Sequence, residues 1–350
     1  MKLKEVYIGE LKISVPIIQG GMGVGISMWK LASAVSIEGG VGVISAAQPG
    51  FRNKNFFEDA FKSNLAALAE NIKKAKEASK GGIIGVNIMR ASTNYAEYVR
   101  CCVENGADLI ISGAGLPTEL PSLLENTKVK FAPIVSSLKA AQVLFKRWDK
   151  RFDRVADFVV IEGPKAGGHL GFTPEQAENL SQEEYDQEVI KIVNYIDSFK
   201  EKYGKIPVFF GGGVYDRKGI DHYIDLGCSG VQMSTRFVTT EECDAPLAFK
   251  EAYINAKKED IVIVKSPVGL PGRAIQNKFT KNRSTSNEMV KKCFACLEHC
   301  NPATTPYCIS SALIRSAEGE VDDSLVFCGE NAWKLDKITT VGEIFNELNN

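Results

Sequence analysis

The sequence predicts a (β/α)8 barrel of the TIM type, an α/β fold, followed by a C-terminal extension. Short runs rich in Val, Ile and Phe recur along the chain without clean alternation of polar and apolar residues. Such continuous runs are typical of strands that are buried on both faces of a parallel sheet. Segments with helical spacing lie between them, and several end in Gly, a common helix C-cap. Eight strand–helix units in about 240 residues match the size of this barrel.

The expected strands and helices alternate along the chain. The strands are VPIIQ from Val15, VGVIS from Val41, IIGVN from Ile83, DLIIS from Asp108, FAPIV from Phe131, DFVVI from Asp157, PVFFG from Pro207 and GVQMS from Gly230. The helical segments are SMWKLASAVSIEGG from Ser27, the long stretch from Asn53 to Lys80, YAEYVRCCVENG from Tyr95, SLKAAQVLFKRW from Ser137, QEVIKIVNYIDSFKEKYG from Gln187 and RKGIDHYIDLG from Arg217.

A doubly wound open sheet is the alternative to the barrel. Such a sheet usually has fewer strands, and a dinucleotide-binding member places G-x-G-x-x-G after its first strand. Here the first strand leads into Gly20-Gly21-Met22-Gly23-Val24-Gly25, which does not fit that spacing. The chain has no Walker A motif either. We therefore expect the barrel.

The pattern of the chain changes after about residue 259. Residues 261–350 contain few strand signals, a basic stretch from Lys278 to Arg283, a cysteine cluster and a final helix-like segment, VGEIFNEL. We expect the barrel to span residues 1–260. Residues 261–350 are expected to pack on the barrel or cover its mouth, without forming an independent domain.

The composition excludes several classes of function. With 43 acidic and 42 basic residues the chain lacks the basic excess of a dedicated nucleic-acid binder. No apolar run approaches the ~18 residues of a membrane span, and the N-terminus lacks the apolar core of a signal peptide. The nine cysteines are odd in number and too sparse for a disulfide scaffold. We expect a cytoplasmic protein with reduced thiols, without nucleic-acid or membrane partners.

In a barrel of this type the active site lies at the C-terminal ends of the strands. The seventh expected strand ends in Gly211-Gly212-Gly213, and the eighth ends in Ser234-Thr235. Loops after these two strands are the usual phosphate site of the fold, because backbone N–H groups converge there. A single glycine cluster is more often a tight turn. Two clusters on adjacent strands favour phosphate binding.

His169 is the candidate for proton transfer. It follows the sixth expected strand, in a loop with glycines on both sides, and an imidazole titrates near pH 6.5. A structural histidine is the alternative. Three further residues have two interpretations each: Asn87 and Gln232 are structural amides or partners of a ring edge, and Met22 is a core residue or padding for a flat cofactor.

The motifs PIIQGGMG, GVNIM, SGAG, EGPKAGGHLG, FFGGGV, GVQMSTRF and RAIQNKF occur in one order over roughly residues 5–285. Together they resemble the FMN-dependent nitronate monooxygenase family, formerly called 2-nitropropane dioxygenases. Flavin-dependent enoyl-ACP reductases share these motifs. The resemblance implies a (β/α)8 barrel that holds FMN at the C-terminal ends of its strands.

The resemblance also implies roles for individual residues. His169 matches the family's catalytic histidine, which takes the α-proton of a nitroalkane or helps to hold the nitronate. The implied flavin contacts are Gly21, Met22 and Gly23 to the ring and its side chain, Asn87 to the ring edge, Gly212, Gly213, Ser234 and Thr235 to the phosphate, and Gln232 beside them. Two departures stand out: Ser234 replaces the usual Gly of a Q-x-G-T motif, and Pro164-Lys165 is unusual and adds a positive charge near the mouth.

Three functions are compatible with these motifs. The first is oxidation of alkyl nitronates by O2 to a carbonyl compound and nitrite, with no nicotinamide. The second is reduction of an enoyl thioester by NAD(P)H through the flavin, in the same pocket. The third is a flavin-binding module without turnover. The expected partners are a small-molecule substrate with O2 or NAD(P)H, and the sequence leaves a homo-oligomer open.

Four cysteines, Cys293, Cys296, Cys300 and Cys308, lie close together outside the core resemblance. Their spacing fits an iron–sulfur ligand set only loosely. Zinc is another option, and free, partly buried thiols are the favoured interpretation. An iron–sulfur cluster would favour the reductase over the monooxygenase.

Overall fold

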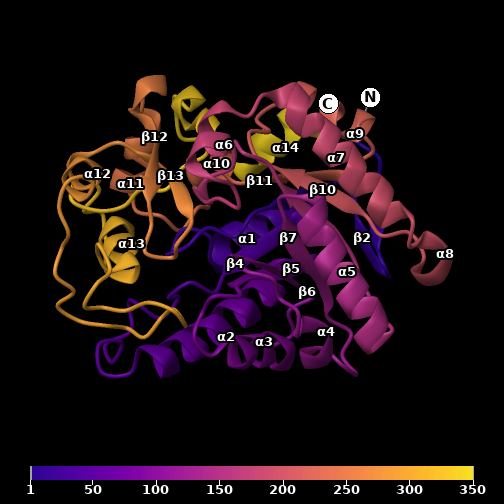
Figure 1. The fold of residues 1–350 in the computed structure, drawn as a ribbon, viewed down its shortest axis with the longest axis horizontal. Helices are drawn as coiled ribbons and strands as arrows, with labels where there is room; N and C mark the ends of the chain where they lie inside the picture. The colour runs from indigo at the N-terminus through magenta and orange to yellow at the C-terminus, as the bar shows by residue number, and fades with distance from the viewer. Residues whose placement is uncertain (1, 350) are drawn as a thin grey trace.

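The computed structural model describes residues 2–349, and a closed barrel of eight parallel strands forms its centre (Figure 1). All eight strands coincide with the expected runs, so the predicted barrel is confirmed. In barrel order they are β10 (Val208–Gly211), β11 (Gly230–Met233), β3 (Ile17–Gln19), β4 (Val41–Ser45), β5 (Ile83–Met89), β6 (Leu109–Gly113), β7 (Lys130–Val135) and β8 (Val159–Glu162).

Apolar side chains fill the interior of the barrel on the N-terminal side of the strands. Ile18, Leu109 and Phe158 are fully buried there. An antiparallel hairpin of β1 (Val6–Ile8) and β2 (Leu11–Ile13) packs its own buried isoleucines against this cluster. This hairpin is not among the strands expected from the sequence. Because this end is filled, the cavity of the barrel lies at the opposite end.

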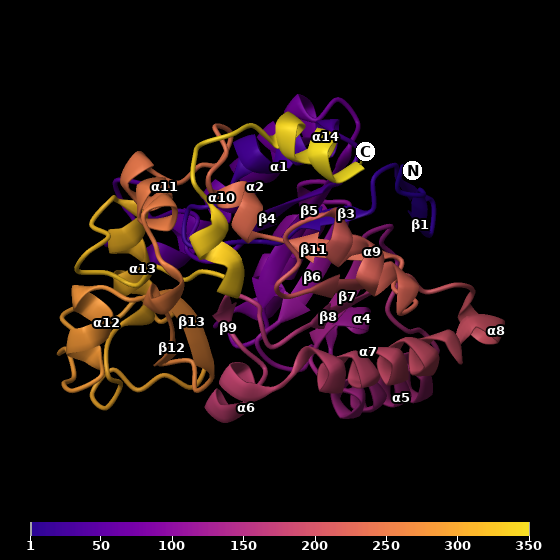
Figure 2. The same cartoon turned by 90° about the horizontal axis from the view of Figure 1, so that it is seen from above.

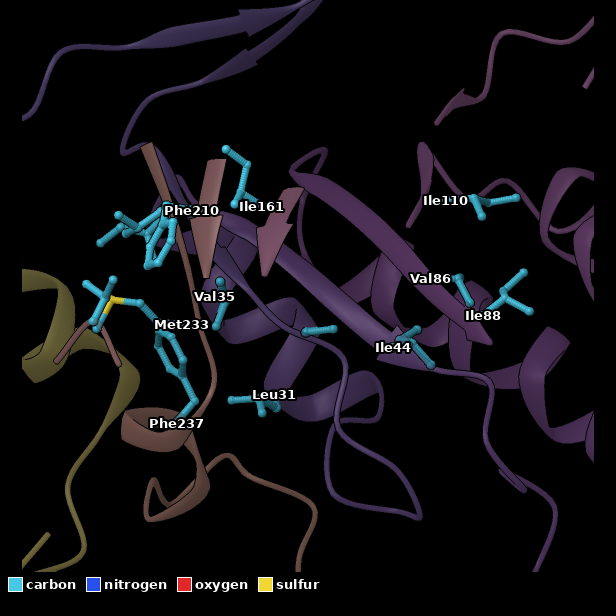
Figure 3. Close-up of a cluster of buried hydrophobic side chains, with 14 of the residues drawn as sticks. Leu31, Val35, Ile44, Val86, Ile88, Ile110, Ile161, Phe210, Met233 and Phe237 are labelled. Carbon is cyan, nitrogen blue, oxygen red and sulfur yellow. The ribbon is translucent and has the colours of Figure 1, made fainter. Parts of the chain in front are cut away.

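A second apolar layer lies between the strands and the surrounding helices. Figure 3 shows buried side chains of this layer, from Leu31 and Val35 of the first helix to Ile44 and Val86 of the strands. The six expected helical segments are confirmed as α1 (Trp29–Ile37), α2 (Ala60–Ala78), α3 (Tyr95–Glu104), α5 (Leu138–Phe152), α7 (Gln182–Asp197) and α9 (Arg217–Asp225). Between β6 and β7 the connection contains only the short α4 (Leu120–Leu123).

A capping residue explains where α2 begins, and a glycine explains how closely α1 packs on the barrel. The Asp59 carboxylate accepts a hydrogen bond from Lys62 N (2.9 Å) at the start of α2, as N-cap residues do. Gly42 of β4 lies so close to α1 that a Cβ there would overlap the carbonyl of Ala32. Glycine at this position therefore lets α1 pack directly on the barrel.

The extension contributes strands as well as helices, so the expectation of few strands after residue 259 is wrong for residues 261–275. The strands β12 (Ile261–Lys265) and β13 (Pro271–Ile275) pair in antiparallel fashion. A further short strand, β9 (Gly168–His169), pairs with β13, with His169 opposite Gly272. IVIVK carries a β-branched signal, whereas PGRAI carries little and becomes a strand through its two partners.

Seven further helices are present in residues 2–349. They are α6 (Pro174–Asn179), α8 (Lys200–Tyr203), α10 (Thr235–Val238), α11 (Leu247–Ile254), α12 (Lys278–Arg283), α13 (Ile309–Ala317) and α14 (Val341–Asn349), with single 3-10 turns at Lys258–Asp260 and Glu330–Lys334. The helix α14 returns to α1, and Leu3 N donates to Asn349 Oδ1 (3.0 Å), so the two ends of the chain meet (Figure 2). Among residues 2–349, no helix combines the length and the apolar character that crossing a membrane requires.

Candidate active site

A cavity of about 430 Å³ opens at the C-terminal ends of the barrel strands. The structure brings all ten residues that the sequence singled out to the wall of this one cavity. They are Gly21, Met22, Gly23, Asn87, His169, Gly212, Gly213, Gln232, Ser234 and Thr235. Asn87 and Gln232 lie on β5 and β11 themselves, His169 lies on β9, and the other residues come from the segments after β3, β10 and β11.

Glycines leave room along one side of the cavity. A Cβ on Gly20 would lie 2.5 Å from Ser234 Oγ, and a Cβ on Gly23 would lie 2.6 Å from Ala47 Cβ. Gly212 and Gly213 have φ values of +131° and +81°, which only glycine adopts without strain. The glycine backbone thus forms a cradle beside the hydroxyl groups that follow β11. Side chains at these glycine positions would fill the cradle.

Gln232 carries an unsatisfied polar atom in this region. Its Oε1 is buried and accepts no hydrogen bond from residues 2–349. Buried polar atoms in native proteins normally have a partner, because leaving one unpaired is costly. The amide oxygen therefore fits a ligand that brings a hydrogen-bond donor to this side of the cavity.

His169 is held by two residues of the extension. Its Nε2 lies 2.7 Å from Ser266 Oγ, and its ring meets Phe327 edge to face with 4.9 Å between centroids. The Ser266 hydroxyl accepts from Val268 N (3.3 Å) and can donate its own proton to Nε2. Burial lowers the pKa of His169 to about 4, since a desolvated imidazolium is disfavoured. The ring is therefore neutral at pH 7.

Arg273 fixes the loop that carries His169. The residue is 5% exposed. Its Nη1 donates to the carbonyls of Pro164 (2.7 Å) and Ala166 (2.6 Å), and its Nη2 donates to that of Ala177 (2.8 Å). Burial lowers the pKa of Arg273 from its usual range. One side chain of β13 thus ties down both ends of the loop.

Glu162 is a titratable group in the cavity to which the sequence analysis gave no role. It ends β8, and its Oε2 accepts a hydrogen bond from Gly171 N (2.8 Å). Burial raises the pKa of Glu162 to about 7, and the hydrogen bond from Gly171 opposes this effect only in part. Its position at the end of a strand could have indicated from the sequence that Glu162 faces the cavity. The shift of its pKa could not be predicted, because it depends on tertiary burial.

The extension supplies part of the wall next to the glycine cradle. A Cβ on Gly329 would lie 2.5 Å from Thr235 Oγ1, and Asn331 Nδ2 donates to Gly213 O (2.7 Å). Lys165 also lines the cavity, with its Nζ 3.9 Å from a carboxylate oxygen of Glu330. Sequence reasoning missed Gly329 and Asn331, because no local pattern indicates which part of the extension returns to the barrel.

The four clustered cysteines do not assemble into a ligand set. Within residues 2–349, no group of three or more His, Cys, Asp or Glu residues is arranged to hold a metal ion. Cys293 is exposed, and Cys308 Sγ accepts from Ser311 N (3.4 Å) at the start of α13. Cys296 lines the cavity, and burial raises its pKa to about 11. The geometry gives no support to an iron–sulfur cluster or a zinc site here.

Comparison with known proteins finds chains of similar sequence and structure. Among curated relatives, a probable nitronate monooxygenase of Staphylococcus aureus (strain Newman) is 28% identical over 291 residues, which covers 78% of this chain and 79% of the relative. FabK from Thermotoga maritima has a similar structure, with a TM-score of 0.72 and 27% identity over 95% of this chain and 91% of that one.

A nitroalkane oxidase of Streptomyces ansochromogenes shares the fold, with a TM-score of 0.69 and 18% identity over 96% of each chain. The family model named nitronate monooxygenase matches residues 4–350. That match covers the barrel, the cavity loops and the extension together. The chain therefore belongs to the nitronate monooxygenase family and is an oxidoreductase.

Proposed function

We propose that this enzyme binds FMN in the 430 Å³ cavity and oxidises alkyl nitronates with O2 to a carbonyl compound and nitrite. The observation that carries the proposal is the combination, in one cavity, of a glycine cradle at β10 and β11 with a neutral histidine held beside it. Membership in the nitronate monooxygenase family supports the same chemistry.

The residues of the cavity fit FMN. Gly212, Gly213, Ser234 and Thr235 would hold its phosphate, since glycine backbone and hydroxyl donors suit an anion. The unpartnered Oε1 of Gln232 suits a hydroxyl donor of the ligand's sugar-like chain. Asn87 and the segment Gly21–Gly23 would contact the ring. When bound, FMN supplies the electron acceptor that the protein's own side chains lack.

The state of His169 indicates which form of the substrate the enzyme takes. With its pKa near 4, the neutral ring is a weak base and abstracts the α-proton of a nitroalkane poorly. A neutral imidazole still donates one N–H hydrogen bond, which suits the negatively charged oxygens of a nitronate. The already ionised nitronate is therefore the preferred substrate over the neutral nitroalkane.

The test is oxygen uptake and nitrite release with propyl-2-nitronate in the absence of NADH. The His169→Ala variant is expected to keep its flavin absorbance after gel filtration and to lose turnover. His299→Ala is the matched control, because His299 is exposed and lies outside the cavity. Loss of flavin from His169→Ala would show that the residue is structural. Absence of nitrite from the wild-type enzyme would overturn the proposal.

Reduction of an enoyl thioester by NAD(P)H is the second candidate function. The observation in its favour is the apolar wall that the extension adds to the cavity, with Phe294, Leu313 and Phe327. Such a wall suits an aliphatic chain longer than a small nitronate carries. Rapid NADH oxidation with crotonyl or longer enoyl thioesters, without turnover of nitronate, would select this reaction.

A further inference from the structure

A second cavity, of about 700 Å³, adjoins the active site and has no role in the proposed reaction. Its wall is formed mainly by β12, α12 and the turn before β12, and Leu325 and Glu330 line both cavities. Basic side chains outnumber acidic ones on this wall. The basic ones are Lys258, Lys265, Arg273, Lys281 and Arg283, and the acidic ones are Glu178 and Glu330.

The positive charge on this wall is largely uncompensated by the protein. Ion pairs form nearby, between Lys278 and Asp323 (3.0 Å) and between Arg315 and Glu288 (3.2 Å). Among residues 2–349, the four lining side chains of Lys258, Lys265, Lys281 and Arg283 form no ion pair of this kind with a carboxylate. The chain as a whole has a net charge of −1, so this local excess does not reflect a basic protein.

Arg283 is the residue of this wall with buried hydrogen-bond donors that have no acceptor among the described residues. Its Nε and Nη1 are buried and donate to no acceptor among the described residues. The guanidinium lies over the ring of Phe279, 5.8 Å from the centroid, which fixes its orientation. A guanidinium whose donors the protein leaves unpaired retains its positive charge for an anionic ligand, and phosphate is an anion that arginine commonly binds.

The floor of the cavity is apolar. All but the last residue of β12 are half-buried, including Ile261, Ile263 and Val264, because no element of the described chain covers the strand fully. We propose that this cavity binds a phosphate-bearing ligand, with the phosphate at Arg283 and Lys281 and an apolar portion of the ligand along β12. The site is separate from the flavin cradle and does not depend on the proposed reaction.

The experiment measures binding of inorganic pyrophosphate to the full-length protein by isothermal titration calorimetry. The protein is first saturated with FMN, so that the glycine cradle is not available to pyrophosphate. We expect wild-type protein to bind and Arg283→Gln to bind at least tenfold more weakly. Lys278→Gln is the matched control, since Lys278 lies on the same helix, is exposed and does not line the cavity.

Two results would overturn the site. One is wild-type protein that does not bind pyrophosphate, and the other is Arg283→Gln that binds as tightly as Lys278→Gln. Circular dichroism of each variant shows whether the fold is intact, and Lys281→Gln tests the same site without altering Arg283. Nitronate turnover is expected to be unchanged in Arg283→Gln, so failure of the proposed reaction and failure of this site are separate outcomes.

Titrations with ADP and with 4′-phosphopantetheine identify the source of the phosphate. Both compounds carry phosphate, but ADP also carries a nucleobase, whereas 4′-phosphopantetheine carries an extended amide chain. Tighter binding of either one than of pyrophosphate supports an apolar contact along β12 and names the ligand class. If neither binds more tightly than pyrophosphate, the apolar part of the proposal is wrong.

Discussion

Within the active-site cavity, burial moves the proton affinities of two residues in opposite directions. It raises the pKa of Glu162 to about 7 and lowers that of His169 to about 4. Both changes have the same cause, because removal from water disfavours whichever form is charged. Near neutral pH the cavity therefore holds a neutral imidazole and a carboxyl group close to its midpoint.

The first prediction concerns Glu162 and the pH dependence of stability. Because its folded pKa lies above the ordinary 4.5, the stability it contributes is present below pH 4.5 and is lost as the pH rises through 7. Glu162→Gln removes the buried charge but keeps the shape. We expect this variant to be more stable than wild type by about 3 kcal/mol at pH 8 and equal at pH 4.

Urea denaturation of the flavin-free protein at the two pH values measures this difference. Glu201→Gln is the control, since Glu201 is exposed and its loss should leave stability unchanged at both pH values. A destabilised Glu162→Gln at pH 8 would show that the carboxylate has a stabilising partner in the folded state.

The second prediction concerns Ser266, which positions His169 from the extension. Ser266→Ala removes the hydrogen bond to Nε2 and leaves the contact with Phe327 to orient the ring. One such bond is worth about 1 kcal/mol, so we expect kcat to fall roughly fivefold while flavin binding is unchanged. Steady-state oxygen uptake measures the change. Ser198→Ala, at the end of α7, should have no effect, and an equal loss in both variants would rule out a positioning role.

At the scale of elements, the small sheet of β9, β13 and β12 links the extension to the loop of His169. Arg273 of β13 reinforces this link through three backbone carbonyls. Lysine retains the charge, but its ammonium group is compact and sits on a flexible side chain. It therefore cannot donate to the carbonyls of Pro164, Ala166 and Ala177 together, as the planar guanidinium does.

The third prediction follows from this geometry. Arg273→Lys should destabilise the protein by about 2 kcal/mol, because buried carbonyls lose their donors. Hydrogen exchange should rise selectively over residues 164–171, with nitronate turnover reduced in parallel. Arg147→Lys, on the exposed face of α5, is the control. Unchanged exchange in residues 164–171 would mean that β13 holds the loop without Arg273.

Comparison of elements also shows what the sequence could predict. The eight barrel strands and six of the helices were predictable, because strands buried on both faces appear as continuous apolar runs and helices keep their own periodicity. The strand β9 was not predictable, since Gly168 and His169 have no strand signal and depend on pairing with β13, about a hundred residues later. The hairpin β1–β2 was missed although its residues alternate in polarity.

The same distinction applies to the site. Residues that follow barrel strands, such as Gly212 and Ser234, could be predicted to meet, because the fold places all strand ends at one mouth. Ser266, Phe327 and Asn331 could not, since they reach the cavity through the course of the extension. The pKa of Glu162 could not either, because it is set by the residues that exclude water around it.

At the scale of the whole molecule, the barrel and the extension share one apolar interior. The helix α14 buries Val341, Ile344, Phe345 and Leu348 in the layer that also contains Leu31 of α1. Removal of residues 261–350 would expose these surfaces on the barrel and would leave β9 without a partner.

The fourth prediction is that residues 1–260 alone neither fold stably nor bind FMN. Large apolar surfaces exposed by truncation promote association, so we expect aggregates by size-exclusion chromatography and no cooperative thermal transition. Co-expression with residues 261–350 as a separate chain is the control for rescue. A monomeric 1–260 fragment that retains flavin would show that the extension is a dispensable cover.

The pairing of β9 with β13 also orders events while the protein is being made. When only the first 260 residues have been synthesised, all eight barrel strands exist. The strand β13, which pairs with His169, and the segment around Asn331 have not yet been made. We therefore expect the complete cavity to form only near the end of synthesis, when the last quarter of the chain has been made and packs against the barrel.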